Sequence, residues 1–244
     1  DTVSNVNCFA GSDGWIDLTV SEATAPYQYL WNNADTLQDI DSLTAGTYEV
    51  VITDSNNCVT LYPVTVTEPL APLALSMDSI NVFCFGDTTG SIDLSVTGGT
   101  PGYSYLWSIG DTLQDVDSLV TGTYQVVVTD TNQCVDSLSA FIDQPFAPIA
   151  LSATQVDILC FGDATGEVDL TVSGGTPAST GYVFDWNTGA FATEDLADIP
   201  FGPYAVLVTD SLLCSDTLSV TLTQPDAPID IDFTILNVSC FGDS

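Results

Sequence analysis

The sequence contains no lysine, arginine or histidine, whereas aspartate and glutamate together number 33. Basic side chains neutralise phosphates in nucleic-acid complexes and attract proteins to anionic membranes, so this composition argues against both partners. It also removes the usual general bases and Schiff-base amines of enzymes. Lysine–asparagine isopeptide cross-links are excluded for the same reason. We therefore expect a protein that is not an enzyme and binds no nucleic acid.

Long apolar runs are also missing, so the sequence offers no transmembrane helix, and it has no recognisable signal peptide. The chain is nevertheless 45% hydrophobic, and its mean hydropathy is positive. Acidic disordered tails lack this content of β-branched and aromatic residues. The net charge of −33 therefore indicates a folded protein with an anionic coat. Self-repulsion within that coat should be relieved by salt or divalent cations.

One stretch organises the chain and occurs three times, beginning at Gly46, Gly122 and Gly202 and ending at a cysteine 12 residues later. In the second copy Tyr124, Val126 and Val128 alternate with polar or smaller residues, which predicts a β-strand with one face against a core. A Gly-x-Tyr opening is typical of strand F of an immunoglobulin-like sandwich, where a tyrosine corner pins the preceding loop.

The repeat extends over the whole sequence, because Cys-Phe phrases recur at spacings of 76, 76 and 80 residues, at Cys8, Cys84, Cys160 and Cys240. A period of this length indicates an array of similar units. We place repeats at residues 1–69, 70–145 and 146–225, with the truncated start of a fourth at 226–244. The chain reads as a piece of a longer array.

Each repeat holds about seven short apolar-alternating segments with turn signals between them, which predicts a β-sandwich. The fold class is therefore all-β, with tandem immunoglobulin-like β-sandwich modules of about 76–80 residues. Tyr103, Tyr105 and Trp107 share one face of a strand, and we interpret them as core packing rather than as a sugar-binding platform. Two prolines three residues apart close each repeat, so the joints should be short and stiff.

Several motifs recur along the chain: Cys84-Phe-Gly-Asp-Thr-Thr-Gly, Gly98-Gly-Thr-Pro, the aromatic strand ending at Trp107, the Gly122 strand and the closing Gln144-Pro. Together they resemble the SprB-type repeat of very long surface adhesins in gliding Bacteroidota. The first repeat departs from the pattern at Ala10-Gly11 and at residues 21–25. The resemblance implies secretion through the type IX pathway, display on the cell surface and a role in adhesion or gliding motility.

The cysteines recur at fixed positions, and with no histidine to activate them they indicate disulfides in an oxidising compartment. Two pairings fit the count. Pairing within a repeat joins Cys8–Cys58, Cys84–Cys134 and Cys160–Cys214, and staggered pairing joins Cys58–Cys84, Cys134–Cys160 and Cys214–Cys240. We favour pairing within repeats because it makes each repeat self-contained, although the two cysteines could lie at opposite ends of a sandwich. A loop of that length contributes about 4 kcal/mol in the chain-entropy model.

Some carboxylates recur in register, and they admit two interpretations. The functional interpretation is Ca²⁺ bound by loop carboxylates, which would stiffen the array. The alternative is solubility and turn formation, because aspartate is a favoured turn residue. No EF-hand-like spacing is present. The candidate Ca²⁺ ligands are Asp54, Asp130, Asp210, Asp87 and Asp163.

A further pattern, Asp followed by Ser or Thr and an aliphatic residue, resembles the acceptor motif for O-glycosylation in Bacteroidota. Such triplets also arise by chance in a β protein of this composition. The candidate acceptors are Thr36, Ser42, Ser79, Thr112, Ser118, Ser137, Ser211 and Thr217.

Two classes of function fit these features. One is a stalk segment of a long secreted adhesin, with neighbouring repeats of the same chain and surface polysaccharide or other cells as its partners. The other is a structural subunit of an extracellular filament, a homopolymer assembled through outer faces of the repeats. Exposed apolar residues such as Val127 and Leu207 on outward faces would favour the filament. We expect the stalk.

Overall fold

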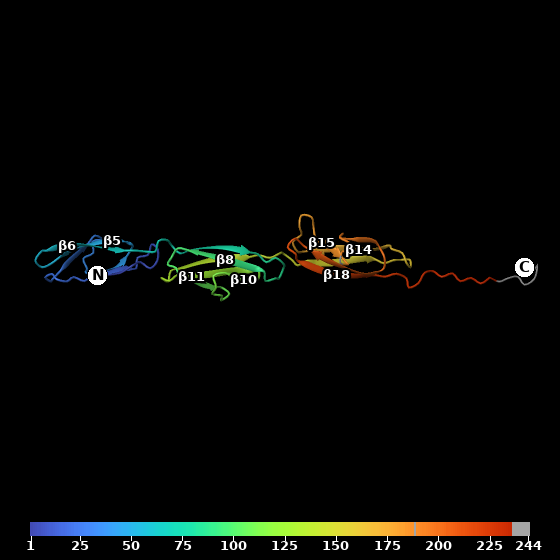
Figure 1. Ribbon diagram of the computed structural model, residues 1–244, viewed down its shortest axis with the longest axis horizontal. Coiled ribbons are helices and arrows are strands. Elements are labelled where there is room, and N and C mark those ends of the chain that lie inside the picture. The colour runs from blue at the N-terminus through green and yellow to red at the C-terminus, as the bar shows by residue number, and fades with distance from the viewer. Residues whose placement is uncertain (188, 236–244) are drawn as a thin grey trace, which may run out of the picture. The chain divides into compact units, whose positions relative to one another are not determined.

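The computed structural model describes residues 1–187 and 189–235, and regular structure in this part of the chain is entirely β-strand. Each repeat contributes six strands, one fewer than the approximate number expected, in two three-stranded antiparallel sheets (Figure 1). The all-β immunoglobulin-like class predicted from the sequence is confirmed. No described segment forms a helix long and apolar enough to cross a membrane.

The strands follow the same order in each repeat. In the first, one sheet is β1 (Thr2–Ser4), β2 (Gly14–Asp17), β4 (Ile40–Leu43) and the other β3 (Gln28–Trp31), β5 (Gly46–Thr53), β6 (Val59–Val66). In the second, the sheets are β7 (Ala74–Ile80), β8 (Gly90–Thr97), β10 (Val116–Leu119) and β9 (Ser104–Trp107), β11 (Gly122–Thr129), β12 (Val135–Ile142). In the third, they are β13 (Ala150–Val156), β14 (Gly166–Ser173), β16 (Leu196–Ile199) and β15 (Val183–Trp186), β17 (Gly202–Thr209), β18 (Ser215–Leu222).

The strand predicted to organise each repeat is the central strand of its sheet. β11 lies between β9 and β12, with Tyr124, Val126 and Val128 buried. The Tyr124 hydroxyl donates to the Val120 carbonyl at 3.0 Å, and the corresponding tyrosines of the other repeats make the same bond four residues back. This bond is the expected tyrosine corner, and it fixes the loop that enters the strand.

A tryptophan lies at the centre of each core, as the alternation predicted. Trp107 is 2% exposed, and its indole N–H donates to the Leu113 carbonyl at 2.9 Å. A buried ring whose only polar atom is satisfied in this way stabilises the core without the cost of an unpaired donor. The aromatic strand is therefore core packing, and Tyr105 beside it has a phenol pKa raised mainly by burial.

One recurring aspartate is explained by the fold alone. Asp115 accepts a hydrogen bond from the Leu94 amide at 2.9 Å, and Asp39 and Asp195 make the equivalent bond in their own repeats. Each carboxylate ties the loop before the fourth strand to the second strand of the repeat or, in the first repeat, to the residue that follows that strand. These acids are structural residues.

The chain divides into two compact units. The first comprises Asp1–Val82 with Thr88–Asp143, and the second comprises Phe83–Asp87 with the chain from Gln144 onward. The short segment Phe83–Asp87 comes from the second repeat in sequence but belongs to the unit of the third. Each of the ranges 1–69, 70–145 and 146–225 holds one pair of sheets and one buried core. The repeat boundaries themselves remain predictions, and residues 236–244, with Cys240, lie outside the described part.

Candidate functional site at the repeat junctions

In the second and third repeats the Cys-Phe-Gly-Asp phrase, which lies near the start of the repeat, forms a tight turn. In the second repeat the Asp87 amide donates to the Cys84 carbonyl at 3.1 Å, and Gly86 has a φ of +82°, a conformation that glycine adopts without strain. The Gly86 amide donates to the side chain of Gln144 at 3.0 Å. Gln144, near the end of the second repeat in sequence, therefore stabilises the Cys84 turn near the start of the same repeat.

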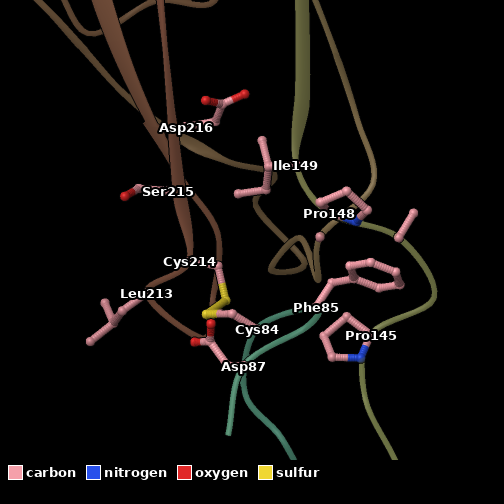
Figure 2. A pocket seen from close by; sticks show the side chains of 12 residues that line it. Cys84, Phe85, Asp87, Pro145, Pro148, Ile149, Leu213, Cys214, Ser215 and Asp216 are labelled. Carbon is pink, nitrogen blue, oxygen red and sulfur yellow. A yellow bond between two sulfur atoms is a disulfide. The ribbon is translucent and has the colours of Figure 1, made fainter. Parts of the chain in front are cut away.

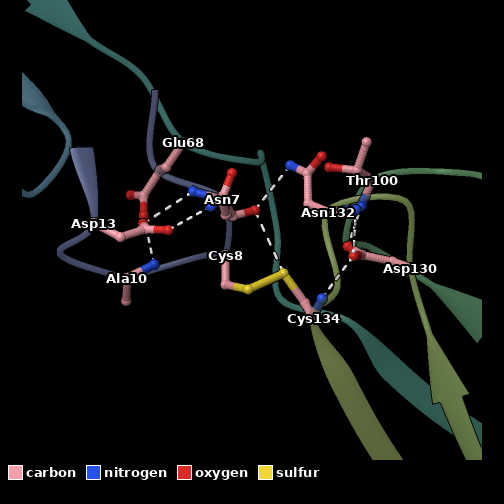
Figure 3. Close-up of a disulfide and its surroundings, with 9 residues drawn as sticks. All are labelled: Asn7, Cys8, Ala10, Asp13, Glu68, Thr100, Asp130, Asn132 and Cys134. Atoms are coloured by element: carbon pink, nitrogen blue, oxygen red, sulfur yellow. Dashed lines mark hydrogen bonds between the residues drawn. A yellow bond between two sulfur atoms is a disulfide. The ribbon is translucent and has the colours of Figure 1, made fainter. Parts of the chain in front are cut away.

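The turn that holds the second cysteine is built around a buried aspartate. Asp130 is 2% exposed, and its Oδ1 accepts the amides of Asn132 and Cys134, each at 2.9 Å. Its Oδ2 accepts the Thr100 amide at 2.8 Å, so one carboxylate joins two turns (Figure 3). Asp210 makes the same three bonds in the third repeat. Amide donors to a carboxylate are strong hydrogen bonds, so Asp130 serves as an anchor.

The linker between repeats is seated on the Gly-Gly turn of the repeat that follows it. The Ala71 carbonyl accepts the Gly99 amide at 3.0 Å. A Cβ atom on Gly98 would lie 1.8 Å from the Pro72 carbonyl oxygen, and the φ of Gly98 is +69°. The third repeat has the same arrangement at Ala147 and Gly175. Glycine is therefore required at the first position of this turn, because any side chain would displace the linker.

The disulfides join successive repeats, and both pairings considered from the sequence are wrong. Cys8 is bonded to Cys134, with the two α-carbons 5.7 Å apart (Figure 3), and Cys84 is bonded to Cys214, with the α-carbons 5.6 Å apart (Figure 2). The pairs within repeats, Cys8–Cys58, Cys84–Cys134 and Cys160–Cys214, do not form, and neither do the staggered pairs Cys58–Cys84 and Cys134–Cys160. The staggered pair Cys214–Cys240 is excluded because Cys214 is bonded to Cys84.

The reason is the length of one strand. The Val6 amide donates to the Thr67 carbonyl, so the turn with Cys8 lies where β6 ends, whereas Cys58 lies where β6 begins. Eight residues of strand span about 26 Å, and a disulfide needs α-carbons within about 7 Å. The two cysteines of one repeat are therefore at opposite ends of its sandwich, and each pairs with the neighbouring repeat.

Side-chain contacts reinforce the first junction. The Asn132 amide group donates to the Asn7 carbonyl at 2.9 Å, next to the disulfide (Figure 3). Asn7 is itself held by Asp13, whose carboxylate accepts its backbone and side-chain N–H groups. Asn7, directly before Cys8, is thus held both by Asp13 of its own repeat and by Asn132 of the next.

The second junction contains a cleft of about 510 Å³ beside the disulfide. Figure 2 shows Phe85 extending from the Cys84 turn toward Pro145 and Pro148 of the linker. The ring remains 43% exposed. Asp87 and Asp216 face the same cleft.

Two cysteines of the described part remain thiols. Cys58 and Cys160 are both exposed. In sequence position Cys58 corresponds to Cys134 and Cys214, and Cys160 corresponds to Cys8 and Cys84. Of the six candidate disulfide cysteines, four form disulfides and two, Cys58 and Cys160, do not.

The candidate Ca²⁺ ligands do not come together. Within residues 1–187 and 189–235, no three His, Cys, Asp or Glu side chains form a group that could hold a metal ion. Asp87 and Asp163 are exposed in their Cys turns, and Asp54 accepts the Asn56 and Cys58 amides. The Cys58 amide is the largest cause of the lowered pKa of Asp54. Calcium binding stays a prediction.

The candidate O-glycosylation residues share one property, which is that their side chains are exposed. They are Thr36, Ser42, Ser79, Thr112, Ser118, Ser137, Ser211 and Thr217. Exposure makes each accessible to modification, and glycosylation itself stays a prediction.

The fold and junctions define a class: a tandem array of immunoglobulin-like sandwiches linked by disulfides between repeats. The family model of the SprB repeat matches this chain at residues 1–36, 78–112 and 152–191, once in each repeat, and confirms the resemblance seen in the motifs.

Several solved structures match this chain at low sequence identity. Extracellular domains 3–5 of Drosophila OTK are 11% identical, with a TM-score of 0.36, over 83% of this chain and 86% of that one. The eight N-terminal Ig domains of DSCAM are 10% identical, with a TM-score of 0.37, over 91% of this chain and 36% of that one. Domains 1–6 of the surface layer protein SbsC are 13% identical, with a TM-score of 0.30, over 93% of this chain and 41% of that one. No curated protein matches the sequence.

Proposed function

We propose that this chain is a stalk segment of a long secreted cell-surface adhesin that mediates attachment and gliding motility. The observation that carries the proposal is that each described junction is joined twice, once by a linker seated on a Gly-Gly turn and once by a disulfide. A stalk must transmit load between a surface and a distant contact. Doubly joined junctions suit that task, and the SprB repeat supports it.

The setting of the proposal is extracellular. Disulfides persist in oxidising compartments, and this chain forms two of them. Export through the type IX pathway follows from the resemblance to SprB-type proteins. The role is structural rather than enzymatic, because the chain has no His, Lys or Arg to supply the commonest catalytic groups.

Binding to surface polysaccharide or other cells is the proposed contact. Each repeat is proposed to make a weak contact. Many similar repeats held on one stalk raise the overall avidity through effective concentration. The anionic coat keeps neighbouring stalks apart, since like charges repel within a Debye length of about 8 Å at physiological salt.

The test is made in the bacterium that produces the protein. Protease treatment and antibody labelling of intact cells should find the repeats at the cell surface, and in-frame removal of the whole repeat region should reduce attachment and gliding. Removal of a single repeat should leave both nearly unchanged, because repeats are interchangeable in a stalk. An intracellular location, or normal attachment without the repeats, contradicts the proposal.

The second candidate, a filament subunit, is favoured by one observation. Leu106, Val135 and Phe141 are exposed on the outer face of the β9–β11–β12 sheet. Of the two residues noted from the sequence, Val127 is half-buried and Leu207 is exposed. Electron microscopy of the native protein separates the candidates: a solitary thread supports the stalk, and a multi-stranded helical filament supports assembly through these faces.

Calcium and glycans belong to the proposal as additions that stiffen and protect the stalk. If a calcium chelator leaves the melting temperature unchanged, the proposal of bound calcium is rejected. An intact mass equal to that of the bare polypeptide, 25.7 kDa for this segment, removes the glycans.

A further inference from the structure

The two disulfides close loops that overlap in the sequence. One joins Cys8 to Cys134 and the other Cys84 to Cys214, so residues 84–134 belong to both loops. A covalent route therefore enters at Cys8, crosses to Cys134, runs backward to Cys84 and crosses to Cys214. This route contains a segment of 50 residues, whereas the main chain between Cys8 and Cys214 covers 206.

We propose that this interlocked pattern is a fail-safe covalent bypass that keeps the array continuous when its backbone is cut. Any single cut between Cys8 and Cys214 leaves both products joined. A cut before Cys84 is bridged by Cys8–Cys134, a cut after Cys134 is bridged by Cys84–Cys214, and a cut between Cys84 and Cys134 is bridged by both. Disulfides within each repeat would leave the linkers unprotected.

The linkers are where protection is needed. Leu70 and Phe146 have fully exposed side chains in the segments that connect the repeats. Exposed chain without regular structure is the preferred substrate of proteases. Trypsin-like enzymes find no cleavage site because lysine and arginine are absent. Enzymes that prefer large apolar residues find a fully exposed site in each linker, and the bypass spans both of them.

The same connectivity limits extension under force. Fully extended chain spans about 3.5 Å per residue, so the bypass route stretches to about 190 Å between Cys8 and Cys214. The main chain between the same residues would reach about 720 Å. The disulfides thus reduce the maximum length of this part by roughly fourfold, and residues 84–134 carry the load.

The experiment is limited chymotrypsin digestion of the whole chain at a dose that cuts once, after Phe146. Without reductant, the nicked protein should migrate as one species of full mass, and with reductant it should separate into two fragments. The matched control is Cys84→Ser with Cys214→Ser, which should release both fragments without reductant. Release of a separate fragment of residues 1–146 from the unmodified protein in the absence of reductant overturns the proposal.

A second measurement does not depend on the double variant folding. The unmodified chain, held by its two termini in an optical trap, should lengthen at full extension by about 540 Å when dithiothreitol is added, because 156 residues join the stretched route. An unchanged length overturns the proposal. Neither result depends on whether the protein is an adhesin, so failure of the bypass and failure of the proposed function are distinguishable.

Discussion

Cys8 and Cys134 are 126 residues apart in the sequence, and their α-carbons lie 5.7 Å apart across a disulfide. The bond crosses from the end of one sandwich to the start of the next. The disulfide lies beside a linker whose Ala71 carbonyl accepts a hydrogen bond from the Gly99 amide. The disulfide and the docked linker both restrict bending at this junction, and the loss of each should lower the free energy of unfolding separately.

Loss of the first junction disulfide should lower the free energy of unfolding of the first two repeats. We expect Cys8→Ser to cost about 2–5 kcal/mol, the range found when native disulfides are removed. Cys134→Ser and the double variant should cost a similar amount, because all three remove the same bond. Denaturant unfolding checks this. Cys58→Ser is the control and should stay within about 0.5 kcal/mol of the unmodified protein. Additive costs for the two single variants would contradict the pairing.

Chemical labelling should distinguish the cysteines. Under native conditions without reductant, iodoacetamide should modify Cys58 and Cys160 but not Cys8, Cys84, Cys134 or Cys214. Peptide mapping by mass spectrometry then identifies the crossed pairs. Recovery of a Cys8–Cys58 or Cys84–Cys134 peptide would restore the arrangement within repeats that the sequence favoured.

Gly98→Ala should be more destabilising than an ordinary glycine replacement. The added Cβ would lie 1.8 Å from the Pro72 oxygen, so the linker must leave its seat. We expect a loss of about 2–4 kcal/mol, of which the left-handed φ accounts for about 1 kcal/mol. Gly110→Ala is the matched control, because Gly110 also has a positive φ but has open space around it. Thermal unfolding of both variants isolates the contribution of linker docking, and equal losses would argue against it.

Asp130→Ala should destabilise the second repeat by about 3 kcal/mol or more, because three partly buried amides lose a charged acceptor. Asp130→Asn should cost less, since its oxygen still accepts the Asn132 and Cys134 amides while its N–H₂ group faces the Thr100 amide. Exposed Asp93→Ala is the control and should change stability by no more than about 0.5 kcal/mol. Equal stability of all three variants in chemical denaturation would show that the anchor is unimportant.

The end of β18 should loosen in acid. Asp157 accepts the Thr223 amide at 2.8 Å, and this bond is the largest cause of its lowered pKa. A carboxyl whose pKa is lower in the folded state stabilises that state above its unfolded pKa, near 3.8, and loses the effect as pH falls through the folded pKa. The protection factor of the Thr223 amide against hydrogen exchange should therefore fall below pH 4. In Asp157→Asn this fall should be absent, because Asn5 and Asn81 make the same bond in the other repeats without a titrating group. Identical pH profiles for the two proteins would refute the argument.

Much of this protein is determined by local pattern. The alternation of Tyr124, Val126 and Val128 specifies a strand with one buried face. The Gly-x-Tyr opening predicts the tyrosine corner, in which the Tyr124 hydroxyl donates to the Val120 carbonyl. Burial of Trp107 follows from the same period of two. The spacing of the Cys-Phe phrases specifies three repeats. The strand, the corner and the buried tryptophan depend on residues close together in the sequence, and the repeat is visible when the sequence is compared with itself, so the sequence alone shows them.

Only the tertiary structure decided the partners of the cysteines and the task of the recurring acids. Counting left two pairings open, and both were wrong, because an eight-residue strand places Cys8 and Cys58 at opposite ends of a sandwich. The sequence marked Asp130 as a recurring acid, and the structure shows that its carboxylate accepts three amides, one of them 30 residues away at Thr100. The disulfide partners and the hydrogen-bond partners of the carboxylates depend on which turns meet in space. Residue type and spacing leave that undetermined.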